Sequence, residues 1–249
     1  MQLALDKFGE GDERSEGERF VPLMIWQTAP FQTWYRAQTD AGNVLQSARL
    51  LYSFRPGYKD FVFLSILKVA IYIASEDRVK ENEFVVSRTD ISSVLLWRKK
   101  LPLEQSEVVI VKEFRSPAAT KDGFIRELVG GSSPSKDDNP REVISQETQE
   151  ETGAWIEPDR FNFHMARQLM GTLASHKSHL HSVRLSEEEI DWFKAQKDVP
   201  HGKEEDTERT FVEVHTIRNI LDNKVELDWA TVGQILYLYC QEWEHLNED

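Results

Sequence analysis

The sequence predicts an α+β chain in which helices accompany a mixed β-sheet. Segments rich in β-branched and aromatic residues interleave with helical patterns, but without the regular strand–helix–strand alternation of a doubly wound fold. A chain of 249 residues suits one large domain, or one domain with an appendage, and it contains no internal repeat. These observations favour an α+β fold or a mixed-sheet sandwich.

The N-terminal part of the chain differs in composition from the rest. Residues 1–19 are rich in Gly, Glu and Asp and predict a solvated leader. Residues 20–54 are aromatic, and apolar side chains fall at helical spacing in the second half of this stretch, at Val44, Leu45, Ala48, Leu51 and Tyr52. We predict a helix with a buried face there, ended by Pro56.

The remaining elements follow from local patterns. Strands are predicted where β-branched and aromatic residues concentrate, over 61–75, 83–87, 92–98 and 108–114, near 161–173 and over 210–216. An Asn139 cap, Pro140 at the first helical position and Gly153 beyond the last predict a helix over 140–152. A Ser186 cap predicts a short helix, and an apolar stripe predicts a closing helix over 228–246.

Charge and cysteine content exclude several classes of function. The chain has 43 acidic and 30 basic residues, a formal net charge of −13, which disfavours binding to a nucleic-acid backbone. An acidic protein can still hold an anionic substrate when a metal ion bridges them. The single cysteine, Cys240, allows no internal disulfide, and the N-terminus lacks an apolar signal segment. We therefore expect a soluble, cytoplasmic protein without a membrane span.

Three glutamates carry the chemistry that we expect. Glu147, Glu150 and Glu151 stand at positions i, i+3 and i+4 of the predicted helix, so they share one face. They lie near its C-terminal end, where the helix dipole disfavours anions. A fully solvated acidic face is one interpretation. The other is a divalent cation site, because hard cations such as Mg²⁺ take carboxylate ligands.

The segment 131–154 resembles the Nudix box, whose pattern is Gly, five residues, Glu, seven residues, Arg-Glu-aliphatic-x-Glu-Glu-x-Gly-aliphatic. The three glutamates, Gly153 and Ala154 match this pattern. Gln146 stands in place of the Arg and Thr148 in place of an aliphatic residue. Asp137 or Asp138 replaces the first Glu, and the loop has one extra residue. The missing arginine bears on catalytic rate more than on metal binding.

Further segments resemble the ADP-ribose pyrophosphatase branch of the Nudix family. They are VVIVKEFRSP (108–117), FIRELVGG (124–131), FVEV (211–214) and the helix that begins at Asp228. The resemblance implies a Nudix fold, a mixed-sheet αβα sandwich, over 58–249, with 1–57 as an N-terminal extension. It also implies Mg²⁺-dependent, or Mn²⁺-dependent, hydrolysis of the pyrophosphate bond of a nucleoside diphosphate derivative such as ADP-ribose or a nucleotide sugar.

By the same resemblance, Glu147, Glu150 and Glu151 are catalytic and hold the metal together with the carbonyl of Gly130. Arg115, Glu127 and Arg126 would bind the substrate. For these three an ordinary ion pair is the alternative. Two other functions stay open, namely a catalytically weakened nucleotide-binding module and a Nudix hydrolase for NADH, dinucleoside polyphosphates or capped RNA.

Two further expectations concern the general base and the assembly. The candidates for the base are His176, His179 and His181, or one of Glu187, Glu188 and Glu189. The histidines could also be transition-metal ligands or loop residues without a role. The resemblance implies a homodimer, and we expect Trp26, Phe31, Trp34 or Tyr35 at its interface. The alternative is that these aromatic residues belong to the domain's own core.

Overall fold

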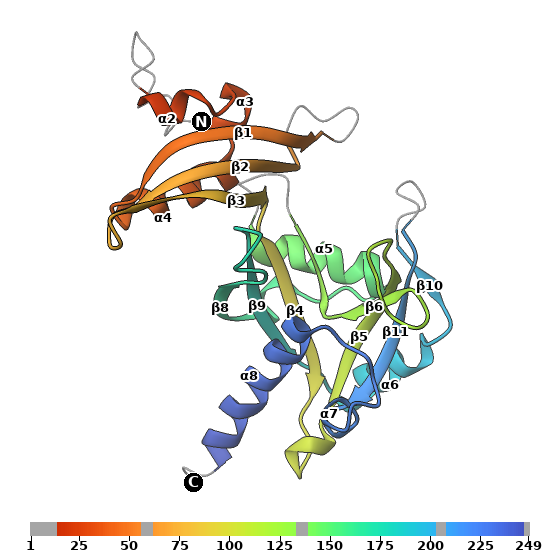
Figure 1. Cartoon of the computed structure of the whole chain (residues 1–249). Helices are drawn as coiled ribbons and strands as arrows, with labels where there is room; N and C mark the ends of the chain where they lie inside the picture. The colour runs from red at the N-terminus through yellow and green to blue at the C-terminus, as the bar shows by residue number, and fades with distance from the viewer. Residues whose placement is uncertain (1–13, 56–61, 133–138, 203–207, 247–249) are drawn as a thin grey trace. The chain divides into compact units, whose positions relative to one another are not determined.

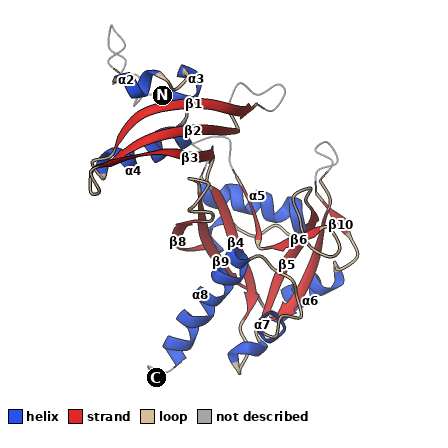
Figure 2. Ribbon diagram, viewed as in Figure 1, coloured by secondary structure: helices blue, strands red, loops and turns tan. Residues whose placement is uncertain are grey.

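The computed structural model describes residues 14–55, 62–132, 139–202 and 208–246. Helices and strands are mixed throughout these residues, so the predicted α+β class is confirmed (Figure 2). The chain divides into two compact units, Met1–Asp90 with Arg167–Lys177 (unit 1) and Ile91–Ala166 with Ser178–Asp249 (unit 2). Parts of the predicted leader, Pro56 and both Asp137 and Asp138 lie outside the described residues.

Unit 1 is a three-stranded antiparallel sheet packed against short helices (Figure 1). Its strand order is β1-β2-β3, and alternate residues of β2, among them Leu67 and Val69, point into the core. Trp26, Phe31 and Tyr35 pack on these side chains. Its elements are α2 (Glu16–Arg19), α3 (Leu23–Trp26), α4 (Ala29–Asp40), β1 (Val44–Phe54), β2 (Leu64–Ile73) and β3 (Arg78–Arg88).

The helix predicted over residues 44–52 is wrong, because β1 occupies this segment and pairs with β2 along its length. The register shifts between Leu45 and Ser47 and again between Leu50 and Tyr52. Such irregularities break the strict alternation of a strand, so the buried Leu45 and Ala48 are three positions apart and mimic a helical pattern. The compact unit also runs to Asp90, so the predicted division at residue 57 does not match a boundary of the structure.

Unit 2 is built on a mixed sheet in the order β10-β11-β5-β4-β9-β8, with β6 paired to β5 and β7 to β4. The β4 and β9 strands are parallel, whereas the pairs β10–β11, β11–β5, β5–β4, β4–β7 and β5–β6 are antiparallel. Its strands are β4 (Ile91–Arg98), β5 (Glu107–Phe114), β6 (Phe124–Glu127), β7 (Val129–Gly131), β8 (Asn162–Gln168), β9 (Lys177–Arg184), β10 (Pro200–His201) and β11 (Thr210–Thr216). Its helices are α5 (Pro140–Thr152), α6 (Glu187–Ala195), α7 (Ile217–Leu221) and α8 (Trp229–Leu246), with 3-10 turns η1 (Leu103–Gln105) and η2 (Pro158–Arg160).

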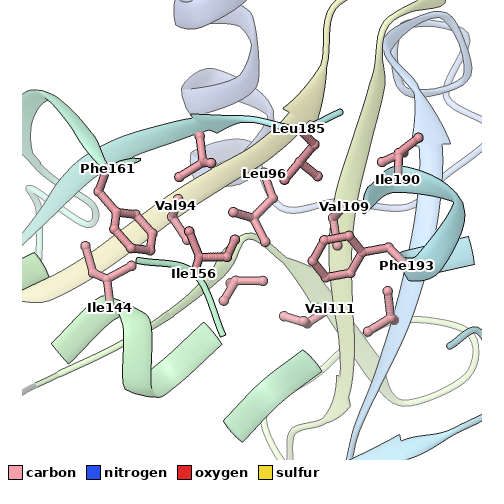
Figure 3. Packing of buried hydrophobic residues seen from close by; sticks show 13 residues of the cluster. Val94, Leu96, Val109, Val111, Ile144, Ile156, Phe161, Leu185, Ile190 and Phe193 are labelled. Carbon is pink, nitrogen blue, oxygen red and sulfur yellow. The ribbon is translucent and has the colours of Figure 1, made fainter. Parts of the chain in front are cut away.

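Helices cover both faces of this sheet because successive side chains of a strand point to opposite sides. Val109 and Val111 of β5 face α5 and α6, whose Ile144, Ile190 and Phe193 complete one core (Figure 3). The intervening residues of β5, Val108 and Ile110, belong to a second core with Ile217, Ile235 and Leu238 of α7 and α8. The central strands are therefore buried on both faces.

The predicted helix ends are confirmed. Asn139 accepts a hydrogen bond from the Arg141 amide, and Pro140 opens α5. Gly153 ends it in the left-handed conformation with φ 79°. Ser186 forms a capping box with Glu189 at the start of α6. In the described part of the chain, every helix is too short or too polar to cross a membrane.

Candidate functional site

The predicted acidic helix, α5, packs one stripe of its surface against the core of unit 2, and its Glu147 and Glu151 lie toward β7. The packed stripe contains Ile144, Thr148 and Thr152, all fully buried. Thr148 stands where the resemblance predicted an aliphatic residue. Its hydroxyl donates to the Ile144 carbonyl (2.7 Å), so it is satisfied within the helix and can occupy the apolar interior.

Two of the three glutamates lie against the glycines of β7. The Gly130 amide donates a hydrogen bond to Oε2 of Glu151 (3.0 Å). A Cβ atom on Gly131 would lie only 2.2 Å from Cδ of Glu147. The missing side chain at Gly131 therefore makes room for the Glu147 carboxylate. The N–H and C=O of one strand residue point to the same edge, so the Gly130 carbonyl lies on the edge that faces α5.

Two more carboxylates, from Glu113 of β5 and Glu127 of β6, lie close enough to influence Glu151. Burial raises the pKa of Glu151 well above its usual value, and the charges of Glu147, Glu127 and Glu113 raise it further, against the opposing hydrogen bond from Gly130. The pKa of Glu113 is raised as well, first by burial and then by Glu208 and Glu127, although Arg115 opposes the shift. We call Glu113, Glu127, Glu147 and Glu151 the carboxylate cluster.

Arg115 joins this cluster at its outer side. One guanidinium nitrogen lies 2.7 Å from Oε2 of Glu113 and 3.8 Å from Oε1 of Glu127. Its side chain is 43% exposed, whereas that of Glu113 is 8% exposed. The ion pair that the sequence analysis gave as the alternative for Arg115 is therefore present, and it also holds the guanidinium beside the cluster with one side open to solvent.

Arg126 is not brought to the cluster. Neighbouring residues of a strand point to opposite faces, so Arg126 and Glu127 of β6 face different sides of the sheet. Arg126 donates to Asp122 (2.8 Å) and to Glu213 (3.1 Å). The structure thus separates one of the three predicted substrate-binding residues from the other two.

The backbone carbonyl of Glu150 accepts a hydrogen bond from the Gly202 amide (2.8 Å). Its side chain is half-buried. Within residues 14–246, leaving aside the gaps in the description, no three His, Cys, Asp or Glu side chains converge closely enough to hold a metal ion. The carboxylate cluster has the donor chemistry of a hard-cation site, but its members are not drawn together as a ligand set.

The three histidines divide between the two units. His176 belongs to unit 1, and burial followed by the charge of Arg88 lowers its pKa. His179 and His181 lie on β9 in unit 2. Because His181 pairs with Val94, it faces the same side of the sheet as α5. Burial is the main cause that lowers the pKa of His181, which favours a neutral imidazole. The transition-metal interpretation finds no support in the described residues.

Two of the three glutamates after Ser186, Glu187 and Glu189, have structural partners. Glu189 accepts hydrogen bonds from Arg160 (2.5 and 3.1 Å) and from the Ser186 amide (2.7 Å). Glu187 forms an ion pair with Arg98 (3.0 Å). A general base has to be able to approach a substrate proton, and these contacts instead fix α6 to its neighbours. His181 is 3% exposed, so within unit 2 the half-buried His179 meets this condition better.

Glu113 is the residue of the cluster that the sequence analysis missed. It ends a strand of apolar residues and shares the face of Val109 and Val111, since all three are spaced by two. A carboxylate on the buried face of a strand is rarely there for packing alone. That pattern was the available signal for a functional residue.

Comparison with known proteins adds no further support. No model of a protein family matches the chain. A comparison with curated protein sequences gives no match either. Inference about function therefore depends on the residues and geometry described above.

Proposed function

We propose that the chain is a Nudix-type hydrolase of the ADP-ribose pyrophosphatase kind, which cleaves the pyrophosphate bond of a nucleoside diphosphate derivative. The observation that supports this most is the seating of Glu147 and Glu151 of α5 on the two glycines of β7. These are the residues that the resemblance selected, and Gly130 meets Glu151 across 21 positions of the sequence. The sheet with helices on both faces is compatible with the Nudix fold.

The metal proposal rests on the charge of the site. The charges of Glu147, Glu127 and Glu113 raise the pKa of Glu151, and Arg115 contacts Glu113 and Glu127, so carboxylate oxygens from three elements lie near one another. Glu147, Glu150 and Glu151, with the Gly130 carbonyl, would hold Mg²⁺ or Mn²⁺. When bound, such an ion supplies charge neutralisation for the pyrophosphate and activation of water.

The chain's own residues would then orient the substrate. Arg115 is held by Glu113 and is partly exposed, so its free side can donate to a phosphate oxygen, with the planar donor geometry that suits that group. Glu127 lies next to Arg115 and can accept hydrogen bonds from ribose hydroxyls. His179, which is half-buried on β9, is the candidate to accept a proton.

A second candidate function is a nucleotide-binding module with little turnover. The observation that favours it is the lack of a convergent three-ligand set in the described residues, together with Gln146 in place of the box arginine. A panel assay distinguishes the two. ADP-ribose, nucleotide sugars, NADH, dinucleoside polyphosphates and capped RNA would be incubated with the protein and Mg²⁺, and release of a nucleoside monophosphate measured. Turnover of none of them, with binding of one, would favour the module.

Replacing Gln146 with arginine is expected to raise turnover or Mg²⁺ affinity about tenfold. Gln146 is exposed on α5 beside Glu147, and an amide brings no positive charge to the cluster. Arg126 cannot serve instead, because Asp122 and Glu213 hold it on the other face of the sheet. Steady-state kinetics over a Mg²⁺ titration check this. The control is Gln149→Arg, which adds the same charge at an exposed position three residues further along α5. An equal effect of both variants would contradict it.

We also keep the homodimer as a proposal, with a different contact surface. Trp26, Phe31 and Tyr35 are buried in the core of unit 1, so these side chains do not fit the predicted interface. Tyr52 and Phe84, by contrast, are 52% and 46% exposed. They pair with Ile66 and Lys68, which alternate with the buried Leu67, so both lie on the outer face of the unit 1 sheet.

Light scattering on the full chain is expected to give about twice 28.9 kDa. The double variant Tyr52→Glu/Phe84→Glu should give the monomer mass and still fold, because charges cost the monomer little on a face that is open to water once the dimer has separated. Leu101→Glu, at a residue that is 70% exposed in unit 2, is the control and should stay dimeric. A wild-type chain that runs as a monomer at micromolar concentration would contradict the prediction.

A further inference from the structure

One edge of the unit 2 sheet lies along β11, much of which is unpaired on its outer side. The sheet ends with β10, which has two residues and pairs only with Thr210 and Phe211 (Figure 1). In the described part of the chain, residues 212–215 have no strand partner on this side. A cavity of about 640 Å³ lies along this open stretch. It is lined by Lys121, Asp122, Arg126, Lys194, Lys197, Val212, Glu213, Val214, His215, Lys224, Val225 and Glu226.

Positive side chains converge on this cavity from separate parts of the sequence. Lys194 and Lys197 come from α6 and the turn after it, Lys121 from the turn before β6, and Lys224 from the turn after α7. The lining has five Lys or Arg residues and three Asp or Glu residues. In the whole chain acidic residues outnumber basic ones by 43 to 30, so this excess runs against the composition of the protein.

Two of the acidic side chains in the cavity are already neutralised by neighbours. Arg126 contacts both Asp122 (2.8 Å) and Glu213 (3.1 Å). Asp122 also pairs with Lys112 (3.3 Å), and His215 lies 2.9 Å from Glu213. These ion pairs neutralise the carboxylates of Asp122 and Glu213.

Lys194 pairs with the buried Glu107 (3.0 Å) and with Asp191 (2.9 Å), whereas the other lysines of the cavity have weaker ion pairs or none. Within the described residues, no ion pair engages Lys121 or Lys197, and Lys224 pairs with the exposed Asp222. The third acidic residue of the lining, Glu226, is exposed to solvent. The cavity therefore presents an excess of positive charge that a ligand can meet without breaking a buried ion pair.

We propose that this cavity binds a small phosphorylated molecule. Its volume lies within the range of about 300–1,000 Å³ that is typical of small-molecule sites. Lysines on separate elements can surround a phosphate group, and the half-buried Val214 offers apolar surface to the organic part of the ligand. An extended acidic peptide would pair with the strand edge, but only four residues of β11 are open, which favours a compact ligand.

This site is separate from the carboxylate cluster. Glu213 and His215 pair with Ile110 and Val108, whose side chains belong to the core on the α7 and α8 face. Val212 and Val214 of the cavity lie on the other face, with Val109 and Val111, but no member of the carboxylate cluster lines the cavity. The proposal therefore does not depend on the hydrolase function.

Calorimetric titration of the full chain with ADP and with inorganic pyrophosphate tests the proposal. EDTA is present throughout, so that binding bridged by a divalent ion at the carboxylate cluster does not contribute. We expect one ADP site per chain, weakened by added salt, because exposed charges are screened. Lys121→Gln/Lys197→Gln should weaken binding at least about tenfold. Lys80→Gln/Lys177→Gln removes the same charge from unit 1 and should leave binding unchanged.

Several outcomes would overturn the proposal. They are no binding of either phosphate compound at about 1 mM, equal weakening in both double variants, or tighter binding of a hexaglutamate peptide than of ADP. If pyrophosphate binds as tightly as ADP, the proposal holds and the cavity recognises the phosphate groups but not the nucleoside. Glu151→Gln should leave this binding unchanged, so failure of the hydrolase proposal and failure of the cavity proposal give different results.

Discussion

Replacing Glu151 with glutamine is expected to lower Mg²⁺-dependent turnover by at least about 100-fold, since the loss of even an outer partner of a metal ligand costs about 10–100-fold. Glutamine retains an oxygen that can accept the hydrogen bond from the Gly130 amide, so β7 and α5 should stay in contact. What it removes is one negative charge from the carboxylate cluster. The assay is release of a nucleoside monophosphate from ADP-ribose, with and without EDTA.

The same variant is expected to be more stable than the wild type at neutral pH without metal. The folded-state pKa of Glu151 is raised, first by burial and then by Glu147, Glu127 and Glu113. Below its usual value of 4.5 the carboxyl group is neutral in folded and unfolded chains alike. As the pH rises above that value, the unfolded chain loses this proton before the folded chain does, so the free energy of unfolding falls.

Glutamine does not titrate, and the difference in melting temperature between Glu151→Gln and wild type should therefore grow from about pH 4 to pH 8 in EDTA. Added Mg²⁺ should raise the melting temperature of the wild type but not of the variant, because a ligand stabilises the state that binds it. Glu142→Gln, at an exposed position in the first turn of α5, is the control. Wild-type turnover that persists in EDTA would contradict the metal proposal.

The second large effect concerns the glycines of β7, where two similar substitutions should act differently. A Cβ atom on Gly130 would lie 2.2 Å from the Ser92 carbonyl oxygen and 3.0 Å from Cα of Ser93. These are backbone atoms of β4, which cannot move without breaking its pairing with β7. Gly130→Ala should lower the free energy of unfolding by about 1–3 kcal/mol, as overpacked sites do.

Gly131→Ala meets a side chain instead of backbone. Its Cβ atom would lie 2.2–2.5 Å from the carboxylate atoms of Glu147, which can rotate away. We expect turnover to fall at least about tenfold while the melting temperature changes little. Gly233→Ala is the control, because its Cβ atom would have no neighbour within 4 Å and alanine favours the helix α8. Unchanged turnover in Gly131→Ala would mean that the position of Glu147 is not used in catalysis.

Local features of the sequence predicted several elements well. The ends of α5 depend on Asn139, Pro140 and Gly153, and each acts within one turn of the helix. The strand over 210–216 coincides with β11, because its alternation and its flanking polar residues are local signals. The segment over 44–52 was assigned to the wrong class, since the register shifts that disturb its alternation arise from pairing with β2, a strand about twenty residues away.

The sequence by itself determined the α+β class, the capped helix that carries Glu147, Glu150 and Glu151, and the net charge of −13. Only the tertiary structure decided which of these glutamates meet Gly130 and Gly131, and that Glu113 and Arg115 join them. It also decided that Arg126 faces the other side of the sheet. The reason is that helix ends follow from contacts a few residues apart. Which face of the sheet a side chain occupies depends on how strands pair, and the paired residues are far apart in the sequence, so no local pattern predicts it.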